Sequence, residues 1–307
     1  MNRLGWRLLV ALILLPLLAV VLMLFTQNGT RLIVGNLGGL LPLEIEYGSG
    51  TLAGELELAR VAWASDSLRV ELQGLVVELK PGCLWHSSLC FQQLYGRQLT
   101  ITLLPEVGGD EPEDDVSTDT ALFEFPVPME ASQLNLDALT VRWESGQWQQ
   151  GNLEGAVKIN GSTIEVQRAL ISRGRLELAG SSEEGGVFSP PRINLPLVLL
   201  VRELALEDAS WDLGGESGKL DALKLADGSW QSTALRLGSL EMRSLDYGKW
   251  RAGGSLDFSD QWPLSLEVAG HIPAIPDWPA VLGTELTLAA KGNLAGLELQ
   301  LETRAQL

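Results

Sequence analysis

Gln98-Leu99-Thr100-Ile101-Thr102-Leu103 alternates polar and apolar side chains without interruption. Successive side chains of a β-strand point to opposite faces, so this stretch predicts a strand with one dry face and one wet face. No convincing helix of ten residues follows Pro42, and Gly and Ser turn signals separate the remaining stretches. The chain is therefore predicted to be all-β, with antiparallel strands covered on one side only. The same period of two recurs at 55–58, 68–72, 156–160, 175–178, 235–237, 265–268, 285–288 and 297–302.

Several of the predicted strands change phase partway along. The apolar series 68–72 continues at Leu75, one residue out of step, and the slip falls at Gly74. Similar slips separate 134–136 from 139–143 and cross Gly238-Ser239. A β-bulge in one long curved strand accounts for such a slip, and so does a tight turn between two short strands.

An unbroken apolar run, 8–25, lies near the N-terminus. As a helix it would extend roughly 27 Å, which is close to the hydrocarbon thickness of a bilayer. Because Arg3 and Arg7 precede it, the positive-inside rule predicts a cytoplasmic tail at 1–7 and a transmembrane helix at 8–25. A cleaved signal peptide is the alternative. A short helix or connector is expected at 26–42, followed by the β-rich region, 43–307.

The charge of the chain excludes one large class of function. Asp and Glu number 39 against 22 Lys and Arg, which gives a net charge of −17 at pH 7. A nucleic-acid-binding protein needs a basic surface, and so does a protein that adheres to anionic headgroups through a polybasic face. We therefore expect no nucleic-acid partner.

No residue pattern points to catalysis, a cofactor or a metal. The two histidines, His86 and His271, lie outside any catalytic motif, and the chain has no nucleophile elbow or phosphate-binding loop. The acidic segment 106–119 offers oxygen ligands but lacks the spacing of a calcium loop, so we interpret it as a solvated loop. A second loop, 181–191, separates two blocks of strands. We expect no enzyme activity, no cofactor and no metal site.

Cys83 and Cys90 are the two cysteines of the chain. Both lie beyond the predicted membrane helix, which favours an oxidising compartment, and the six residues between them can close a loop. We predict a disulfide between them, with two buried free thiols as the alternative. The Cys-x-x-Cys spacing of a redox-active pair is absent.

The cysteine segment also carries a resemblance to a known family. CLWHSSLC at 83–90, followed by Leu94 and the strand at 98–103, resembles the early region of TamB, an AsmA-like protein anchored in the inner membrane of diderm bacteria. The resemblance runs in order over nearly the whole chain, and its other carriers are the segments 50–54, 256–264 and 292–294.

The resemblance implies a fold and a function. The expected fold is an N-terminal transmembrane helix followed by a long, curved antiparallel sheet that forms an open, taco-like hydrophobic groove in the periplasm. The expected cargo is phospholipid, carried with its acyl chains in the groove toward the outer membrane, in support of outer-membrane protein assembly. TamB proteins engage the outer-membrane barrel TamA through a C-terminal region, which we expect to lie outside this chain. A non-enzymatic scaffold or secretion-machine subunit that binds protein partners is the alternative, as is a closed β-sandwich.

Apolar residues with polar sequence neighbours are the candidates for the dry face. In an open groove they would line one acyl-chain path, and in a closed fold they would form a packed core. The candidates are Leu56, Leu58, Val70, Leu72, Leu99, Ile101, Leu103, Leu176, Leu178, Leu266, Val268, Leu286, Leu288, Leu297 and Leu299.

Overall fold

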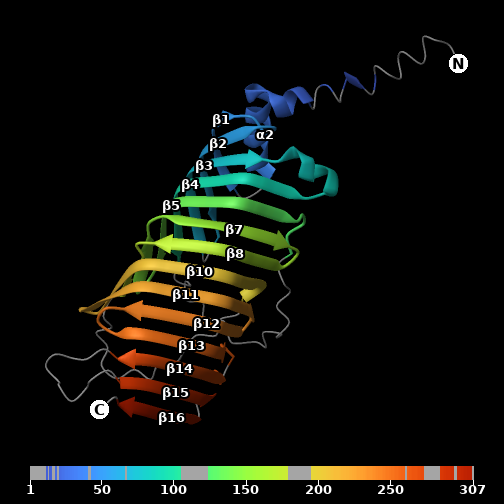
Figure 1. Ribbon diagram of the computed structural model, residues 1–307. Coiled ribbons are helices and arrows are strands. Elements are labelled where there is room, and N and C mark those ends of the chain that lie inside the picture. Colours follow the sequence, from blue (N-terminus) through green and yellow to red (C-terminus); the bar gives the residue numbers. More distant parts are fainter. Residues whose placement is uncertain are drawn as a thin grey trace, which may run out of the picture.

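The computed structural model describes residues 12, 14, 15, 18, 21–40, 43–65, 68–104, 124–178, 195–259, 261–272, 284–293 and 296–305. This part of the chain is mostly β, with one long sheet of sixteen strands and a few short helices (Figure 1). The helices include the α-helix α2 (Gln27–Leu40) and the 3-10 helix η1 (Pro81–His86).

The strands follow one another along the chain. The first eight are β1 (Leu43–Gly50), β2 (Glu55–Ala64), β3 (Leu68–Leu79), β4 (Leu89–Leu103), β5 (Met129–Trp143), β6 (Gly146–Gln150), β7 (Leu153–Asn160) and β8 (Thr163–Ser172). The other eight are β9 (Arg175–Leu178), β10 (Leu195–Leu213), β11 (Glu216–Ser232), β12 (Ala234–Ser244), β13 (Gly248–Asp257), β14 (Leu264–Ile272), β15 (Thr284–Asn293) and β16 (Gly296–Ala305).

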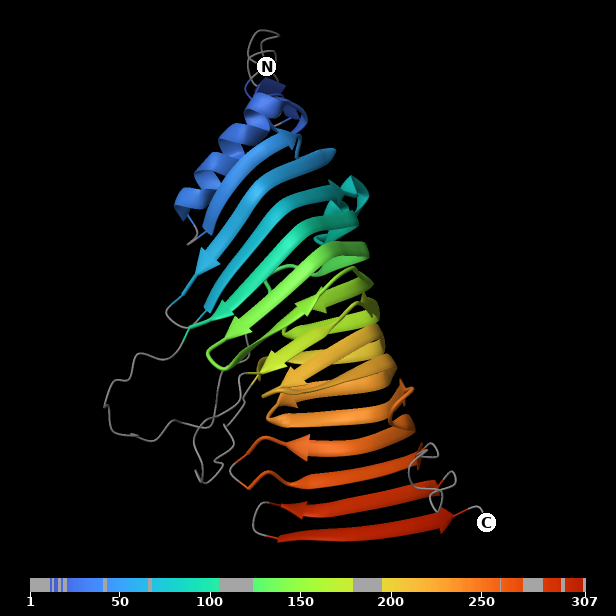
Figure 2. The same ribbon diagram turned by 90° about the vertical axis from the view of Figure 1, so that its left-hand side faces the viewer.

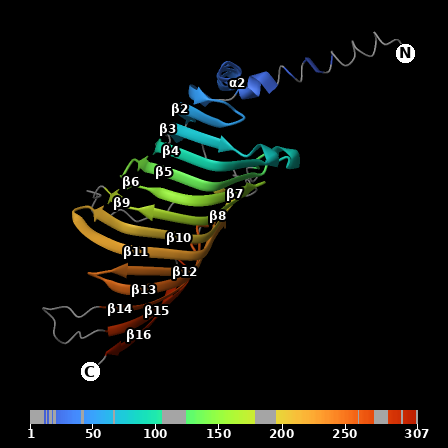
Figure 3. The same ribbon diagram turned by 45° about the horizontal axis from the view of Figure 1, so that its top comes forward.

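Neighbours in the sheet are mostly neighbours in the sequence. The order runs from β1 to β16, and it branches between β5 and β10. One branch consists of β6 and β9, and the other consists of β7 and β8 (Figure 3). β6 and β7 both pair with β5, and β9 and β8 both pair with β10, so the four short strands form two rows between these long strands. The first and last strands lie at opposite ends of an open, twisted sheet (Figure 1).

The expectation of a wholly antiparallel sheet is wrong, because the sheet is mixed. β4 pairs with β5 in parallel, and β10 pairs in parallel with both β8 and β9. A parallel pair needs a long crossover rather than a hairpin turn. Both crossovers contain a loop that the sequence marked, 106–119 and 181–191, and these loops lie outside the described residues. Alternation identifies a strand but carries no information on the direction of its partner.

The phase slips are bends within continuous strands rather than turns between short ones. Gly74 lies inside β3 with a φ of 63°, in the left-handed region that glycine adopts at little cost. On either side of it, Leu75 pairs with Leu58 and Gln73 pairs with Arg60. The slips in β5 and β12 also fall inside single strands, and the register of β12 against β13 shifts between Leu237 and Leu240. Each bend keeps the apolar residues on one face.

A small closed core lies where α2 packs over the first strands (Figure 2). Val34 of α2 is buried against Leu56 and Leu58 of β2. Thr30 is fully buried, and its Oγ1 accepts a hydrogen bond from the backbone N–H of Leu52 at 3.1 Å. α2 therefore covers one end of the sheet.

The predicted cytoplasmic tail at 1–7 lies outside the described residues, and so does much of the predicted transmembrane helix at 8–25. The described positions of that run are helical, and their large side chains are mostly exposed, with Leu12 at 76% and Phe25 at 64%. Within the described residues, no helix combines the length and the apolar character needed to cross a bilayer.

Candidate functional site

One ladder of cross-strand neighbours crosses the sheet from β1 to β16 through apolar residues alone. Residues that pair across neighbouring strands point to the same face, so the ladder is a continuous apolar strip. Its members are Gly50, Leu56, Val77, Leu94, Leu134, Gly155, Ala169, Leu204, Leu225, Leu240, Ala252, Val268, Leu288 and Leu301. We call it the central ladder.

Two further apolar ladders run on the same face, one toward each edge of the sheet. On the side of η1, the ladder comprises Leu89, Met129, Ile159, Ile164, Leu199, Trp230, Leu235, Leu256, Leu264, Gly292 and Leu297. Toward the opposite edge, the ladder comprises Trp63, Val70, Ile101, Val141, Trp148, Leu176, Trp211 and Gly218. Neither ladder contains a charged or polar side chain, so the apolar character of the face extends to both sides of the central ladder.

The other face of the sheet is polar. A representative ladder there comprises Lys224, Glu241, Arg251, Ala269, Thr287 and Glu302, all of them exposed. Arg251 Nη2 and Glu241 Oε1 form an ion pair at 2.8 Å. A hollow of about 630 Å³ on this face is lined by both signs of charge, which is typical of a solvated surface.

Over most of its length the apolar face has no second layer among the described elements. Apart from α2 against β1 and η1 against β4, every substantial contact joins strands that are neighbours in the sheet. Most apolar side chains in the ladders are therefore only half-buried, and on β16 Leu299 is 63% exposed and Leu301 is 59% exposed. Contiguous apolar surfaces of this extent are rare on soluble monomers and are found where proteins contact other proteins, membranes or ligands.

The structure places all fifteen candidate residues on this one face. Leu56 and Leu58 differ from the others because they are buried beneath α2, at 6% and 8% exposure. They belong to a closed core and not to the open part of the face.

The other thirteen candidates lie on the open part of the face, and all but Leu286 have only apolar or small cross-strand partners. Leu286, paired with Gly270 and Thr303, is the one with a polar partner. The pairs are Val70–Ile101, Leu72–Leu99, Leu103–Leu68, Leu176–Trp148, Leu178–Gly146, Leu266–Ala290, Val268–Leu288, Leu286–Gly270, Leu297–Gly292 and Leu299–Ala290.

The residue list derived from the sequence omitted the tryptophans of this face. Trp63, Trp148 and Trp211 stand in one ladder, and Trp250 is the cross-strand partner of Gly270. Their positions in the alternation of their strands would have identified them, as Trp63 follows Val61 by two residues and Trp250 precedes Ala252 by two.

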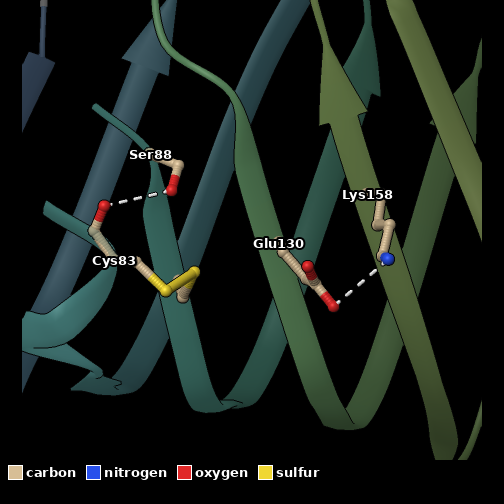
Figure 4. The surroundings of a disulfide bond; sticks show 5 residues. Cys83, Ser88, Glu130 and Lys158 are labelled. Carbon is tan, nitrogen blue, oxygen red and sulfur yellow. Dashed lines mark hydrogen bonds and ion pairs between the residues drawn. A yellow bond between two sulfur atoms is a disulfide. The ribbon is translucent and has the colours of Figure 1, made fainter. Parts of the chain in front are cut away.

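Cys83 and Cys90 form a disulfide in the structure, with an S–S distance of 2.03 Å (Figure 4). The bridge ties η1 to the start of β4. Ser88 Oγ donates a hydrogen bond to the Cys83 carbonyl at 3.1 Å, and the Lys80 N–H donates one to the Cys90 carbonyl at 2.8 Å. The loop is thus held at the edge where β3 ends.

Arg60 links three carboxylates on the polar face near α2. Its Nε lies 3.0 Å from Oε1 of Glu71, and its Nη1 lies 3.6 Å from Glu44 and 3.9 Å from Glu46. The hydrogen bond from Arg60, together with one from Gln73, lowers the pKa of Glu71 below its ordinary value. These charges stay on the wet side of the sheet.

The described residues place no three His, Cys, Asp or Glu side chains where they could hold a metal ion. His86 and His271 are both exposed. The ladders of the apolar face offer contact with apolar groups.

Comparison with known proteins identifies the family. The sequence model described as TamB, N-terminal domain, matches residues 16–307. No curated protein and no solved structure gives a significant match. The family match covers nearly the whole chain, and the described strands form one long sheet that is apolar on one face. The chain belongs to the TamB N-terminal domain family, within the TamB/AsmA-like lipid-transport family.

Proposed function

We propose that this chain is an inner-membrane-anchored periplasmic protein that carries phospholipid along the apolar face of its sheet toward the outer membrane. The observation that supports this proposal is the central ladder, an apolar strip that crosses fourteen strands without a polar residue. A carrier of this kind needs no catalytic group, because lipid moves without making or breaking a covalent bond.

The driving force for binding is the hydrophobic effect. Covering apolar surface is worth about 25 cal/mol per Å², or about 0.8 kcal/mol for each buried CH₂ group. Acyl chains supply such groups in series, and a continuous strip lets each chain slide without crossing a polar barrier. A charged residue in the strip would create such a barrier, which is why its composition matters.

The family and the N-terminal sequence support a proposal for the location and the partners. We propose that residues 8–25 anchor the chain with its N-terminus in the cytoplasm, and that a C-terminal region outside this chain contacts the barrel TamA and supports outer-membrane protein assembly. A periplasm-active reporter fused after Leu307 should be active, and the mature protein should retain the apolar run. Recovery of a mature protein that begins near Asn28 would contradict the anchor.

The decisive test is lipid capture at two adjacent positions. Leu266 lies on the apolar face, and Glu267 is exposed on the polar face of the same strand. A photo-crosslinking amino acid at Leu266 should capture phospholipid in cells, whereas the same amino acid at Glu267 should not. Equal capture at the two positions, or none, would overturn the proposal. Capture of one secretion protein instead of lipid would favour the scaffold alternative.

A further inference from the structure

Five tryptophans lie on the apolar face near the same edge of the sheet: Trp63, Trp143, Trp148, Trp211 and Trp250. β2, β5 and β10 end near this edge, β6 and β13 begin there, and the ladder from Trp63 to Trp211 follows it. We call it the tryptophan edge. Five of the ten tryptophans of the chain thus share one edge of the sheet.

Glycines fix the orientation of three of these rings. An ideal Cβ atom would lie 2.5 Å from Cη2 of Trp148 if placed at Gly174, and 2.1 Å from Cζ2 of Trp211 if placed at Gly218. At Gly270 it would lie 2.2 Å from Cε3 of Trp250. Each indole therefore lies across the backbone of a neighbouring strand, in space that a side chain would fill. The rings form part of the floor of the apolar face.

A polar group without a partner lies beside these rings. Gln150, 6% exposed, is the cross-strand neighbour of Leu139 on the apolar face. Its Oε1 accepts a hydrogen bond from Nε1 of Trp148 at 3.2 Å. Because an indole nitrogen can only donate, this contact assigns the amide oxygen, and the amide nitrogen Nε2 is left buried with no hydrogen-bond partner. A buried donor without an acceptor lowers the stability of the fold, so a ligand atom that accepts a hydrogen bond from it would bind favourably.

Aromatic rings pack at both edges, since Trp211 contacts Tyr247 at the tryptophan edge with ring centroids 5.7 Å apart, but within the described residues the opposite edge holds no buried polar side chain without a partner. There the rings of Trp230 and Phe258 pack at 5.2 Å, and those of Phe258 and Trp262 pack edge to face at 4.9 Å. The indole nitrogen of Trp230 is satisfied by the carbonyl of Ser232 at 3.1 Å. The three rings of this cluster therefore pack against one another.

We propose that the two edges orient the cargo. Indole rings favour the boundary between an apolar body and a polar tip, and in a diacyl lipid this boundary is the ester region. The ester region lies at the tryptophan edge, where Nε2 of Gln150 donates to an ester carbonyl, and the acyl chains extend toward the edge of Trp230, Phe258 and Trp262. This inference rests on the proposed function. Nε2 is closed to water, so an acceptor reaches it only as the cargo parts the side chains around it.

Fluorescence quenching tests the orientation. The full chain, freed of co-purified lipid in detergent, is loaded with phosphatidylglycerol that carries bromine near either the carbonyl end or the methyl end of its acyl chains. Subtracting the quenching of a Trp→Phe variant from that of the unmodified chain isolates one indole. We expect Trp211 and Trp250 to be quenched more by carbonyl-end bromine, and Trp262 more by methyl-end bromine. The reverse order, or the same order at both edges, would overturn the proposal.

A comparison of lipid linkages tests the role of Gln150. Ester-linked and ether-linked phosphatidylglycerols of the same chain length differ in the carbonyl groups that could accept a hydrogen bond. The unmodified chain should bind the ester lipid about threefold to tenfold more tightly, as one neutral hydrogen bond predicts. Gln150→Leu should remove this preference and retain binding. Gln149→Leu, its neighbour on the other face, should keep the preference.

The outcomes separate this inference from the function on which it rests. An ester preference that is absent, or that survives Gln150→Leu, would overturn the assignment to Gln150 and leave lipid carriage intact. Failure of the unmodified chain to bind either lipid would overturn lipid carriage itself.

Discussion

The backbone N–H of Leu52 donates a hydrogen bond to the fully buried Oγ1 of Thr30 at 3.1 Å, which fixes α2 to the turn between β1 and β2. The adjacent Ala53 N–H donates to the carbonyl of Leu24 at 3.1 Å. The helical segment that precedes the sheet is therefore hydrogen-bonded to two consecutive residues of the β1–β2 turn, Leu52 and Ala53. The end of the sheet nearest the proposed membrane anchor is covered by α2, whereas the other described helices and strands leave most of the remaining apolar face uncovered.

Two glycines in α2 give opposite expectations. A Cβ at Gly35 would meet nothing within 4 Å, whereas one at Gly29 would lie 2.3 Å from Cα of Met23. Gly35→Ala should raise the free energy of unfolding by about 0.5–1 kcal/mol through helix propensity. Gly29→Ala should lower it by about 1–3 kcal/mol through the clash. Denaturant melts followed by circular dichroism measure both, and a destabilised Gly35→Ala variant would contradict the packing of α2.

Charged substitutions should distinguish the closed core from the open face. Leu56→Asp places an unpaired charge beneath α2, where its burial should cost several kcal/mol, a large part of a typical stability of about 5–15 kcal/mol. Leu266→Asp places the same charge on a half-buried site that water reaches. We expect Leu56→Asp to unfold the first strands and Leu266→Asp to fold and lose bound lipid.

Thermal melts and lipid mass spectrometry on both variants make the measurement. If Leu266→Asp unfolds as readily as Leu56→Asp, the face is a packed core, and the proposal of an open acyl-chain path is wrong. If it folds and retains lipid, the path does not pass β14.

Removal of the disulfide should destabilise the β3–β4 edge. A bridge with a sequence separation of 7 closes a short loop, and its loss should lower the free energy of unfolding by about 2–3 kcal/mol. Cys83→Ser with Cys90→Ser makes the change, and reductant provides the control. Reductant should lower the melting temperature of the unmodified chain and leave the double variant unchanged. Free thiols that react with a label before reduction would contradict the bridge.

Stability should fall at acid pH in part through Glu71. The hydrogen bond from Arg60 lowers the pKa of Glu71 in the folded chain below its ordinary value of 4.5. A carboxyl group with a lowered folded pKa stabilises the fold above its unfolded pKa, and this contribution is lost as the pH falls through the folded value. Glu71→Gln should therefore flatten the loss of stability below about pH 4.5.

Glu44→Gln is the matched control for this prediction. Glu44 contacts the same Arg60 through a longer, more exposed pair at 3.6 Å, so its replacement should change the acid slope less. Urea melts across the acid range provide the measurement. An unchanged slope in Glu71→Gln would show that the Arg60 contact is not maintained in solution.

The candidate face was largely predictable from the sequence because it depends on local alternation. Leu266, Val268, Leu286 and Leu288 have polar neighbours, and the structure places all four on one face. Leu56 and Leu58 show the same pattern, yet they lie beneath α2. Alternation identifies the dry face of a strand but not what covers it, since the cover comes from residues distant in sequence.

Alternation could have placed the tryptophans on the dry face, but their gathering at one edge and the unpaired amide of Gln150 could not be predicted from the sequence, for a related reason. Gly218 and Gly270 make room for Trp211 and Trp250 only in the observed register. The unpaired amide of Gln150 results from its contact with Trp148 and from the burial of both. Register between strands is a non-local property, and a shift of one residue would reverse every face.

From local patterns alone, one could predict which side of each alternating stretch is dry and where the phase slips fall, at Gly74 and Gly238, although each slip was compatible with a bulge or with a turn. These features follow from the two-residue repeat of the extended backbone and from the conformational freedom of glycine. Three features became known from the three-dimensional structure: β4 and β5 run parallel, four short strands form two rows between β5 and β10, and α2 closes one end. Those choices depend on which segments meet across long connections, and the free energy of such meetings is set by packing and loop closure rather than by any local pattern.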